Sequence, residues 1–228
     1  MKKYLDLLQK CPLFTGVEPE ELLRLLDCLG AQLRPFEKKE VLLAEGDPAA
    51  YIGIVLAGTL HIEQTDYYGS RSIVGQAGPG ELFGESFACA GAAAMPLDEI
   101  AATDGTALLI DCNRILSPCC NVCGFHQQLI RNLVRVMAQK NLAFHQKLTL
   151  VARRTTREKL LAYLLAQAKR AGSRSFSIPF DRQQLADYLL VDRSGLSAEI
   201  GKLRAEGILE CRREHFTLQE SPFADPLI

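Results

Sequence analysis

The spacing of hydrophobic positions changes twice along this 228-residue chain. Near the N-terminus, residues 18–29 place leucines at helical intervals, which predicts an amphipathic helix. Its buried side is expected to carry Leu22, Leu25, Leu26 and Leu29. From residue 32 to residue 111, short apolar runs such as YIGIVLAGTLHIEQTD are separated by glycines instead. Runs of this length between turn residues are typical of a small all-β barrel or sandwich.

Helical spacing returns in residues 124–151, which predict one long helix. Positions in steps of three and four are apolar there, apart from one asparagine: Ile130, Val134, Met137, Asn141, Phe144, Leu148 and Val151. Such a seam is the pattern of a two-helix coiled coil, and an asparagine pair inside it favours two strands. We therefore expect a homodimer, with a wholly internal helix as the alternative. A second stripe is expected to pack on the β-rich domain: Leu129, Leu133, Val136 and Ala143.

The C-terminal part predicts a helix, a strand, two short helices and a β-hairpin. Thr155 or Thr156 can cap a helix that runs to about Lys169. Its inward side is expected to hold Leu160, Leu161, Leu164 and Leu165. SFSIPF predicts a short strand, and ILECRREHFTL predicts two β segments around a turn, which fits a wing.

Two helices joined by a tight turn are predicted within FDRQQLADYLLVDRSGLSAEIGKLRAEGIL. Asp181 with Gln184 forms a capping box at the first, and Asp192 is the N-cap candidate of the second. That second helix is expected over residues 193–205, with Gly207 just past its end. Its inner stripe is Leu196, Ile200 and Leu203. Its other face is slim and polar, as a helix entering the DNA major groove must be: Arg193, Ser194, Ser197, Ala198 and Lys202. An ordinary helical hairpin is the alternative.

Charge is unevenly distributed, although the formal net charge is −1. Residues 1–130 hold 9 Lys/Arg against 17 Asp/Glu, whereas residues 131–228 hold 17 against 10. A basic rear half suits contact with phosphates. Additional DNA-contacting candidates lie around the two helices and at the wing: Arg182, Arg212 and Arg213, with a basic edge of Arg153, Arg154 and Arg157.

Composition excludes several classes of protein. No apolar run approaches the ~20 residues that span a bilayer, and the N-terminus is not a secretory signal, so a cytoplasmic protein without membrane contact is expected. No phosphate-binding glycine motif or catalytic Ser/His/Asp or Cys/His spacing occurs, which argues against an enzyme.

The glycines of the β-rich region carry a family resemblance. Gly46-Asp47, IVLAG with Gly58, and PGELFGE with Gly80, Gly84 and Glu85 resemble the cyclic-nucleotide-binding β-roll. With the long helix and winged helix-turn-helix, the whole chain resembles the cyclic AMP receptor protein/fumarate–nitrate regulator (Crp/Fnr) superfamily of bacterial transcription factors. The implied fold is α+β: a sensory β-roll (jelly roll) domain in residues 1–117, a dimerisation helix in 118–151 and a winged helix-turn-helix in 152–228.

The resemblance implies an effector site in the β-roll. Family members contact the ribose with a glutamate at the Glu85 position and the cyclic phosphate with an arginine about ten residues later. This chain has no Arg or Lys from residue 86 to residue 113, which argues against cyclic AMP, because a buried phosphate needs a cationic partner. An apolar small-molecule effector and a closed core that senses nothing are the two alternatives. The candidate pocket residues are Gly84, Glu85, Ser86, Phe87, Met95 and Leu97.

Cysteines offer a second sensor hypothesis. Cys119, Cys120 and Cys123 follow Cys112 closely, and thiolate clusters bind soft metals or iron–sulfur centres or form redox disulfides. Their spacing matches no common zinc or ferredoxin pattern, so ordinary helix cysteines are the alternative. His61 is the candidate for haem, which some relatives bind through β-roll histidines.

The resemblance implies a function as well. Family members read base edges with the first turns of the recognition helix, and two-fold symmetry implies a palindromic operator. Ala198 departs from the arginine that many relatives have there, and Gly195 is unusual inside a helix. An activator would also contact RNA polymerase. The alternative is a regulatory cyclic-nucleotide-binding-like module that does not bind DNA.

Overall fold

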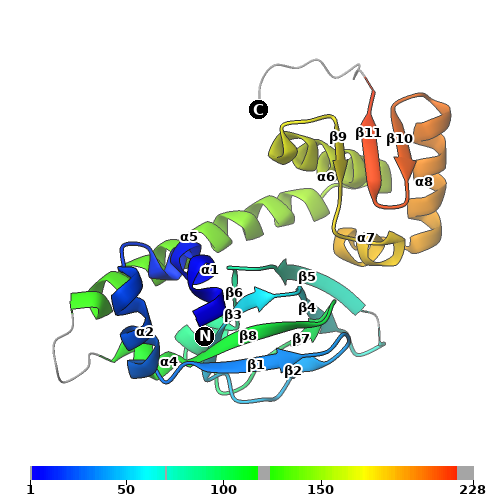
Figure 1. Cartoon of the computed structure of the whole chain (residues 1–228). Coiled ribbons are helices and arrows are strands. Elements are labelled where there is room, and N and C mark those ends of the chain that lie inside the picture. The colour runs from blue at the N-terminus through cyan, green and yellow to red at the C-terminus, as the bar shows by residue number, and fades with distance from the viewer. Residues whose placement is uncertain (1, 70, 118–123, 220–228) are drawn as a thin grey trace. The chain divides into compact units, whose positions relative to one another are not determined.

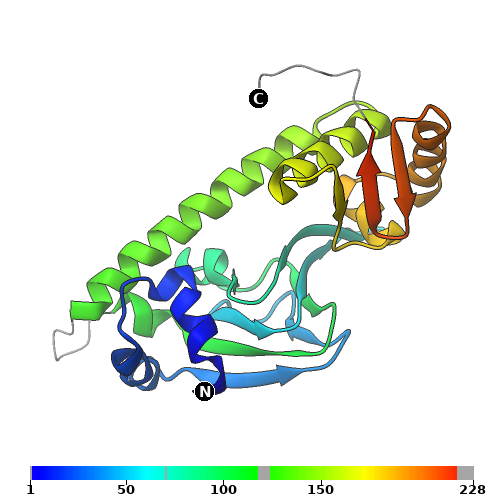
Figure 2. The same ribbon diagram turned by 45° about the horizontal axis from the view of Figure 1, so that its top comes forward.

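The computed structural model describes residues 2–69, 71–117 and 124–219 of the chain. The chain divides into two compact units, Met1–Leu142 and Ala143–Ile228. Their boundary falls inside one helix, α5 (Gly124–Val151), which has the predicted bounds and runs without a break (Figure 2). The division at residues 117 and 151 stays a prediction.

The described residues of the first unit form short helices and eight strands. Its helical segments are η1 (Lys2–Tyr4), α1 (Leu5–Lys10), η2 (Pro12–Phe14), α2 (Pro19–Cys28), α3 (Glu85–Cys89) and α4 (Cys112–Leu116). Its strands are β1 (Gln32–Phe36), β2 (Val41–Leu43), β3 (Tyr51–Ala57), β4 (Leu60–Thr65), β5 (Arg71–Ala77), β6 (Leu82–Phe83), β7 (Asp98–Ala101) and β8 (Gly105–Asp111).

These strands form two four-stranded sheets, which confirms the predicted β-roll (Figure 1). One sheet has the order β1-β8-β3-β6 and the other β2-β7-β4-β5, with antiparallel pairing throughout. Most neighbours in each sheet are distant in sequence, as in a jelly roll.

The middle of each central strand, residues 52–56 of β3 and 107–110 of β8, is buried or half-buried, which is why these segments are continuously apolar. On β3, Ile52 and Ile54 belong to a core shared with the helices, whereas Val55 belongs to the core between the sheets. Gly53 also faces the second core, where an added Cβ would lie 2.0 Å from the Phe83 ring. Only glycine permits that close approach.

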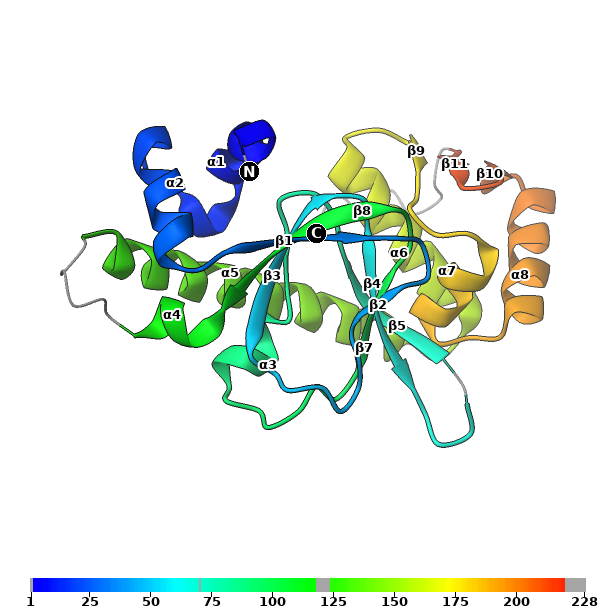
Figure 3. The same cartoon turned by 60° about the horizontal axis from the view of Figure 1, so that its bottom comes forward.

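Helices α1, α2 and the first part of α5 cover the outer face of the β1-β8-β3-β6 sheet (Figure 3). The four predicted leucines are buried, three of them on α2 and Leu29 at its C-cap, as are Leu129, Leu133 and Val136 of α5. Ala143 is exposed, so its predicted packing on the β-roll is wrong. The first unit ends one residue earlier, at Leu142.

In the second unit, the described residues after the end of α5 form three helices and a small sheet. Its elements are α6 (Thr156–Ala171), β9 (Ser175–Ser177), α7 (Arg182–Leu189), α8 (Arg193–Ala205), β10 (Leu209–Arg212) and β11 (His215–Leu218). The three strands pair in the order β10-β11-β9, so the predicted hairpin and strand form one antiparallel sheet.

Helix α6 begins with a capping box between Thr155 and Glu158. Leu160 and Leu164 are buried as predicted, but Leu165 is 47% exposed and its predicted inward position is wrong. Tyr163 is buried instead, because it joins an aromatic cluster with Phe180 and Tyr188. Among the described residues, no helix has both the length and the apolar character needed to cross a membrane.

Candidate DNA-binding surface and sensor core

The turn between α7 and α8 is held by caps on both sides. Asp181 accepts a hydrogen bond from the Gln184 backbone N–H at 2.9 Å, and the Gln184 side chain accepts one from the Asp181 N–H, which confirms the capping box. Leu190 ends α7 in the left-handed region, with φ 54°. Asp192 then caps α8 by accepting from the Gly195 N–H at 2.6 Å. The predicted bounds of α8 are confirmed.

Helix α8 has one buried and one exposed side. Leu196, Ile200 and Leu203 are at most 4% exposed and attach the helix to its unit. The predicted DNA-contacting residues all lie on the exposed side: Arg193, Ser194, Ser197, Ala198 and Lys202. Only small side chains follow Arg193 on this side in the first two turns, so the helix end is narrow enough to enter a groove.

Gly195 has a structural reason for its place in the first turn of α8. A Cβ added there would lie 2.5 Å from Asp192 Oδ2. The same carboxylate accepts from the Ser194 hydroxyl at 2.6 Å. Glycine therefore lets the capping carboxylate fold closely over the helix end that presents Arg193.

Arg157 of α6 ties α8 to its unit. Its guanidinium lies 3.3 Å from Glu199 Oε1 and also pairs with Glu206, one residue past the end of α8. The sequence predicts Arg157 as part of a basic edge, together with Arg153 and Arg154. Its charge is engaged with two carboxylates, one on α8 and one just after it.

The wing presents Arg212 and Arg213, which are both exposed at the tip of the β10–β11 hairpin. Arg182 is half-buried instead. Its guanidinium carbon lies 5.8 Å from the centroid of the Phe216 ring, and its Nη2 donates toward Cys211 Sγ at 3.9 Å. The structure thus gives Arg182 a packing role, while its DNA contact stays a prediction.

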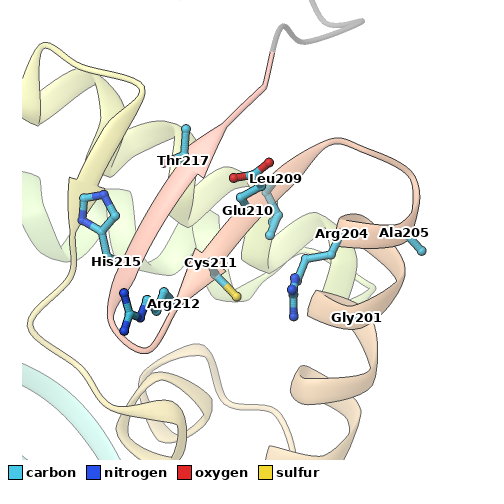
Figure 4. A pocket seen from close by; sticks show the side chains of 9 residues that line it. All are labelled: Gly201, Arg204, Ala205, Leu209, Glu210, Cys211, Arg212, His215 and Thr217. Carbon is cyan, nitrogen blue, oxygen red and sulfur yellow. The ribbon is translucent and has the colours of Figure 1, made fainter.

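A cavity of about 570 Å³ lies between α8 and the hairpin (Figure 4). Arg204 from the helix and Arg212 from β10 contribute to its wall, and His215 lies on β11 (Figure 4). The His215 ring is hydrogen-bonded to the hydroxyls of Ser175 and Ser177 on β9, at 2.9 and 3.1 Å. These hydrogen bonds connect β11 to β9, so His215 has a structural role in the three-stranded sheet.

In the first unit, Glu85 is joined to the long helix. Glu85 is 2% exposed, and its Oε1 lies 2.9 Å from Nζ of Lys140 on α5. The same ammonium donates to the Leu82 carbonyl at 2.6 Å. The resemblance assigns Glu85 to a ligand ribose, but here the carboxylate already has a cationic partner within the chain. Sequence reasoning missed Lys140 because nothing in the spacing of α5 distinguishes it from other polar helix residues.

A second buried carboxylate, Glu99 of β7, adjoins this ion pair. Glu99 accepts from the Gly84 N–H at 2.9 Å, which holds the start of α3. Burial, and then the charge of Glu85, raise the pKa of Glu99 to about 8. Among the described atoms, Glu85 Oε2 and Glu99 Oε2 are buried without a hydrogen-bond partner. The Glu85–Glu99–Lys140 cluster is therefore a polar site inside an apolar domain.

The other predicted pocket residues lie around this cluster. Ser86 donates to Glu85 Oε1 at 3.1 Å. Met95 and Leu97 are 2% and 7% exposed and belong to the core between the sheets, against which Phe87 packs. Gly84 adopts φ 72° at the N-cap of α3. This tight packing favours the alternative of a closed core over a preformed apolar pocket.

The predicted seam on α5 is largely exposed in the single chain. Val134, Phe144 and Leu148 are 61%, 44% and 61% exposed, and Asn141 is exposed between them. Ile130 and Met137 are half-buried. An apolar helix face of this length is a surface that a second copy of the helix can cover.

The predicted metal or redox cysteines, Cys119, Cys120 and Cys123, lie outside the described residues. Within the described part of the chain, no group of three His, Cys, Asp or Glu side chains is arranged to hold a metal ion. His61 lies on β4 with Nδ1 3.6 Å from Glu63 Oε1 and is 4% exposed.

Comparison with known proteins matches both units to families. Residues 33–117 match the cyclic nucleotide-binding domain, and residues 158–220 match the Crp-like helix-turn-helix domain. The transcriptional activator protein FnrL of Cereibacter sphaeroides is 24% identical over 77% of this chain and 71% of its own length. The anaerobic regulatory protein of Pasteurella multocida is 23% identical over 93% of this chain and 77% of its own length.

Solved structures show the same fold. The c-di-GMP-responsive global regulator CLP of Xanthomonas campestris superimposes with a TM-score of 0.75 at 17% identity, over 90% of this chain and the whole of that one. At this identity the likeness concerns the fold alone, and it includes both the β-roll and the helix-turn-helix.

Proposed function

Because the chain belongs to the Crp/Fnr superfamily of transcription regulators, we propose that it binds a palindromic operator as a homodimer and reads bases with the first two turns of α8. The observation that carries this proposal is the exposed, narrow N-terminal end of α8. Arg193 stands at its first position, and the Asp192 cap orders the backbone behind it. A bidentate arginine is the commonest reader of guanine in the major groove. The helix-turn-helix match argues against a regulatory module without DNA binding.

The exposed face of α5 supports the dimeric part of the proposal. Val134, Phe144 and Leu148 leave large apolar surfaces in water in the single chain. Pairing two copies would bury them and place Asn141 opposite its counterpart, where the two amides satisfy each other. Two recognition helices related by a two-fold axis would then meet half-sites one helical turn apart.

The proposal is tested by selecting bound sequences from a random double-stranded library with the full chain. Oxidised and anaerobically reduced protein should be used in parallel, because the redox hypothesis for the cysteines predicts a difference. Enrichment of an inverted repeat in either state supports the proposal. Failure to enrich any sequence, in both states and with broad effector mixtures, would contradict it.

Arg193→Ala measures base reading directly. We expect it to lower affinity for the selected operator by about 1–3 kcal/mol and to relax preference at one position of each half-site. Arg204→Ala is the matched control, because it removes an equal charge from the exposed C-terminal end of the same helix. If fluorescence anisotropy shows equal losses on operator and random DNA for both variants, Arg193 is a phosphate contact and not a base contact.

We also propose that the β-roll effector is not a cyclic nucleotide. Residues 86–113 supply no cation for a phosphate, and the Glu85 carboxylate is paired with Lys140. A phosphate brought beside Glu85 would meet a buried carboxylate, and the one ammonium seen beside that carboxylate among the described residues, Lys140, is already paired with it. Isothermal titration with cyclic AMP, cyclic GMP and c-di-GMP, the effector named for the Xanthomonas regulator, should give no heat of binding. Saturable binding of any of them would refute this part.

Further parts of the proposal follow from the family. The curated relative from Cereibacter is named a transcriptional activator, and an activator of this kind would contact RNA polymerase when bound beside a promoter. The protein would then work in the cytoplasm, as a regulator and not as an enzyme. Reporter transcription with purified polymerase, with and without the operator upstream, decides between activation and repression.

A further inference from the structure

Two thiols from separate elements of the first unit lie in contact. The Sγ atoms of Cys89 and Cys112 are 3.7 Å apart. Cys89 is the last residue of α3, and Cys112 is the first residue of α4, directly after β8. A disulfide would require the two sulfurs to approach from this contact distance to the S–S bond length of about 2.05 Å.

Solvent accessibility differs between the two cysteines, so we expect the more accessible one to react first. Cys89 is half-buried, whereas Cys112 is 3% exposed. Burial raises the pKa of both thiols, that of Cys89 to about 12. Few thiolates form at neutral pH, so reaction is slow to begin. Once one sulfur is oxidised, however, the other is already in place to resolve it.

We propose that Cys89 and Cys112 form a redox modification site, at which a hydroperoxide converts the two thiols to a disulfide. With hydrogen peroxide, the Cys89 sulfur attacks the O–O bond and becomes a sulfenic acid, with one water as the leaving product. The Cys112 sulfur then attacks the sulfenic sulfur and displaces a second water. Two S–H bonds are lost, one S–S bond forms, and two electrons pass to the peroxide. A small dithiol such as dithiothreitol restores the two thiols by exchange and is itself oxidised to a cyclic disulfide.

Helix α3 connects this site to α5. Glu85, which holds Lys140, lies one turn before Cys89 on the same helix, and its charge contributes to the raised pKa of the Cys89 thiol. A disulfide would draw the end of α3 toward α4 and change the position of Glu85 under Lys140. The regulatory consequence rests on the proposed DNA-binding function: oxidation should change operator affinity, by roughly 5- to 150-fold if the coupling is typical of allosteric proteins.

Peptide mapping tests the site independently of DNA. The fully reduced chain is treated with hydrogen peroxide, and the remaining thiols are alkylated before digestion. Trypsin leaves both cysteines in one peptide, because residues 72–113 contain no Lys or Arg, so a second cleavage at Asp98 or Asp104 must separate them. We expect a linked pair of peptides that dithiothreitol releases. Alkylation of both thiols at doses that already oxidise the exposed Cys28, or linkage of Cys112 to another cysteine, would overturn the proposal.

Variants separate the site from its consequence. Cys89→Ser changes a half-buried position and should abolish the linked peptides and the response of operator affinity to peroxide. Cys28→Ser is the control and should keep both. A disulfide that forms without any change in affinity would overturn the regulatory consequence and leave the site standing. If no operator exists, peptide mapping still decides the site.

Discussion

Two glycines of α8 provide a sharp test of how the recognition helix begins. Gly195 lies in its first turn and Gly201 in its third. Helix propensity alone predicts that Gly→Ala stabilises either position by about 1 kcal/mol at most. Their surroundings differ: a Cβ at Gly201 meets nothing within 4 Å, whereas one at Gly195 lies 2.5 Å from Asp192 Oδ2.

Gly201→Ala should therefore raise the free energy of unfolding by about 1 kcal/mol. Gly195→Ala gains the same propensity but pushes the Asp192 carboxylate away from its hydrogen bond, and losing an N-cap costs roughly 0.5–2 kcal/mol. The two effects nearly cancel or leave a small net loss. We expect the Gly201→Ala protein to be more stable than the Gly195→Ala protein by about 1 kcal/mol.

Urea unfolding at one fixed protein concentration measures both variants, since a dimer's apparent stability depends on concentration. Asp192→Ala in each background completes the cycle. It should cost about 1 kcal/mol when residue 195 is the native glycine, and little in the chain that already carries Gly195→Ala. Equal stabilisation by both glycine substitutions would refute the reasoning, because it would mean that the cap tolerates a methyl group.

Two other predictions concern the first unit and the dimer. Because Glu99 has its pKa raised to about 8 when folded, the native state keeps a proton that the unfolded chain releases above a pH of about 4.5. The free energy of unfolding should therefore fall by on the order of a few kcal/mol as the pH rises from about 4.5 to about 8. Glu99→Gln should flatten this part of a pH profile measured by urea unfolding. An unchanged profile would contradict the raised pKa of Glu99. Leu148→Glu should yield monomers in light scattering, whereas Leu165→Glu, which changes another exposed leucine on α6, should leave dimers intact; a dimeric Leu148→Glu protein would disprove the seam.

Local signals explain why so much of the second unit is predictable from sequence. An N-cap and the backbone N–H that it binds lie three residues apart, so the sequence alone places Asp181 and Asp192 and limits the cap of α6 to Thr155 or Thr156. The leucine stripes of α2 and the first half of α5 succeed for a related reason, since a helix face follows from period alone.

Predictions fail where the answer depends on what another segment does. Ala143 continues the apolar stripe of Leu129, Leu133 and Val136 but lies beyond the core that this stripe covers. On α6, Tyr163 occupies the core position that the sequence predicts for Leu165. Lys140 lies 55 positions from its partner Glu85, and Cys112 lies 23 positions from its partner Cys89. The fold of the first unit brings each pair together. The periodic pattern of apolar residues does not predict contacts between residues that are so far apart in sequence.

The ion pairs of Arg157 with Glu199 and Glu206 show that the positive charges of residues 131–228 cannot all be counted as DNA contacts. The second half of the chain carries an excess of positive residues, yet at least one of them shields carboxylates on and beside the helix that would approach DNA. Removing Arg157 would expose two repelling charges and weaken binding at every sequence, much as the loss of a phosphate contact does. The number of counterions released on binding would distinguish the cases, because that number depends on cations that touch the phosphates. A mutational scan of affinity alone would assign Arg157 to the interface, whereas a salt titration would assign it to the scaffold that holds α8.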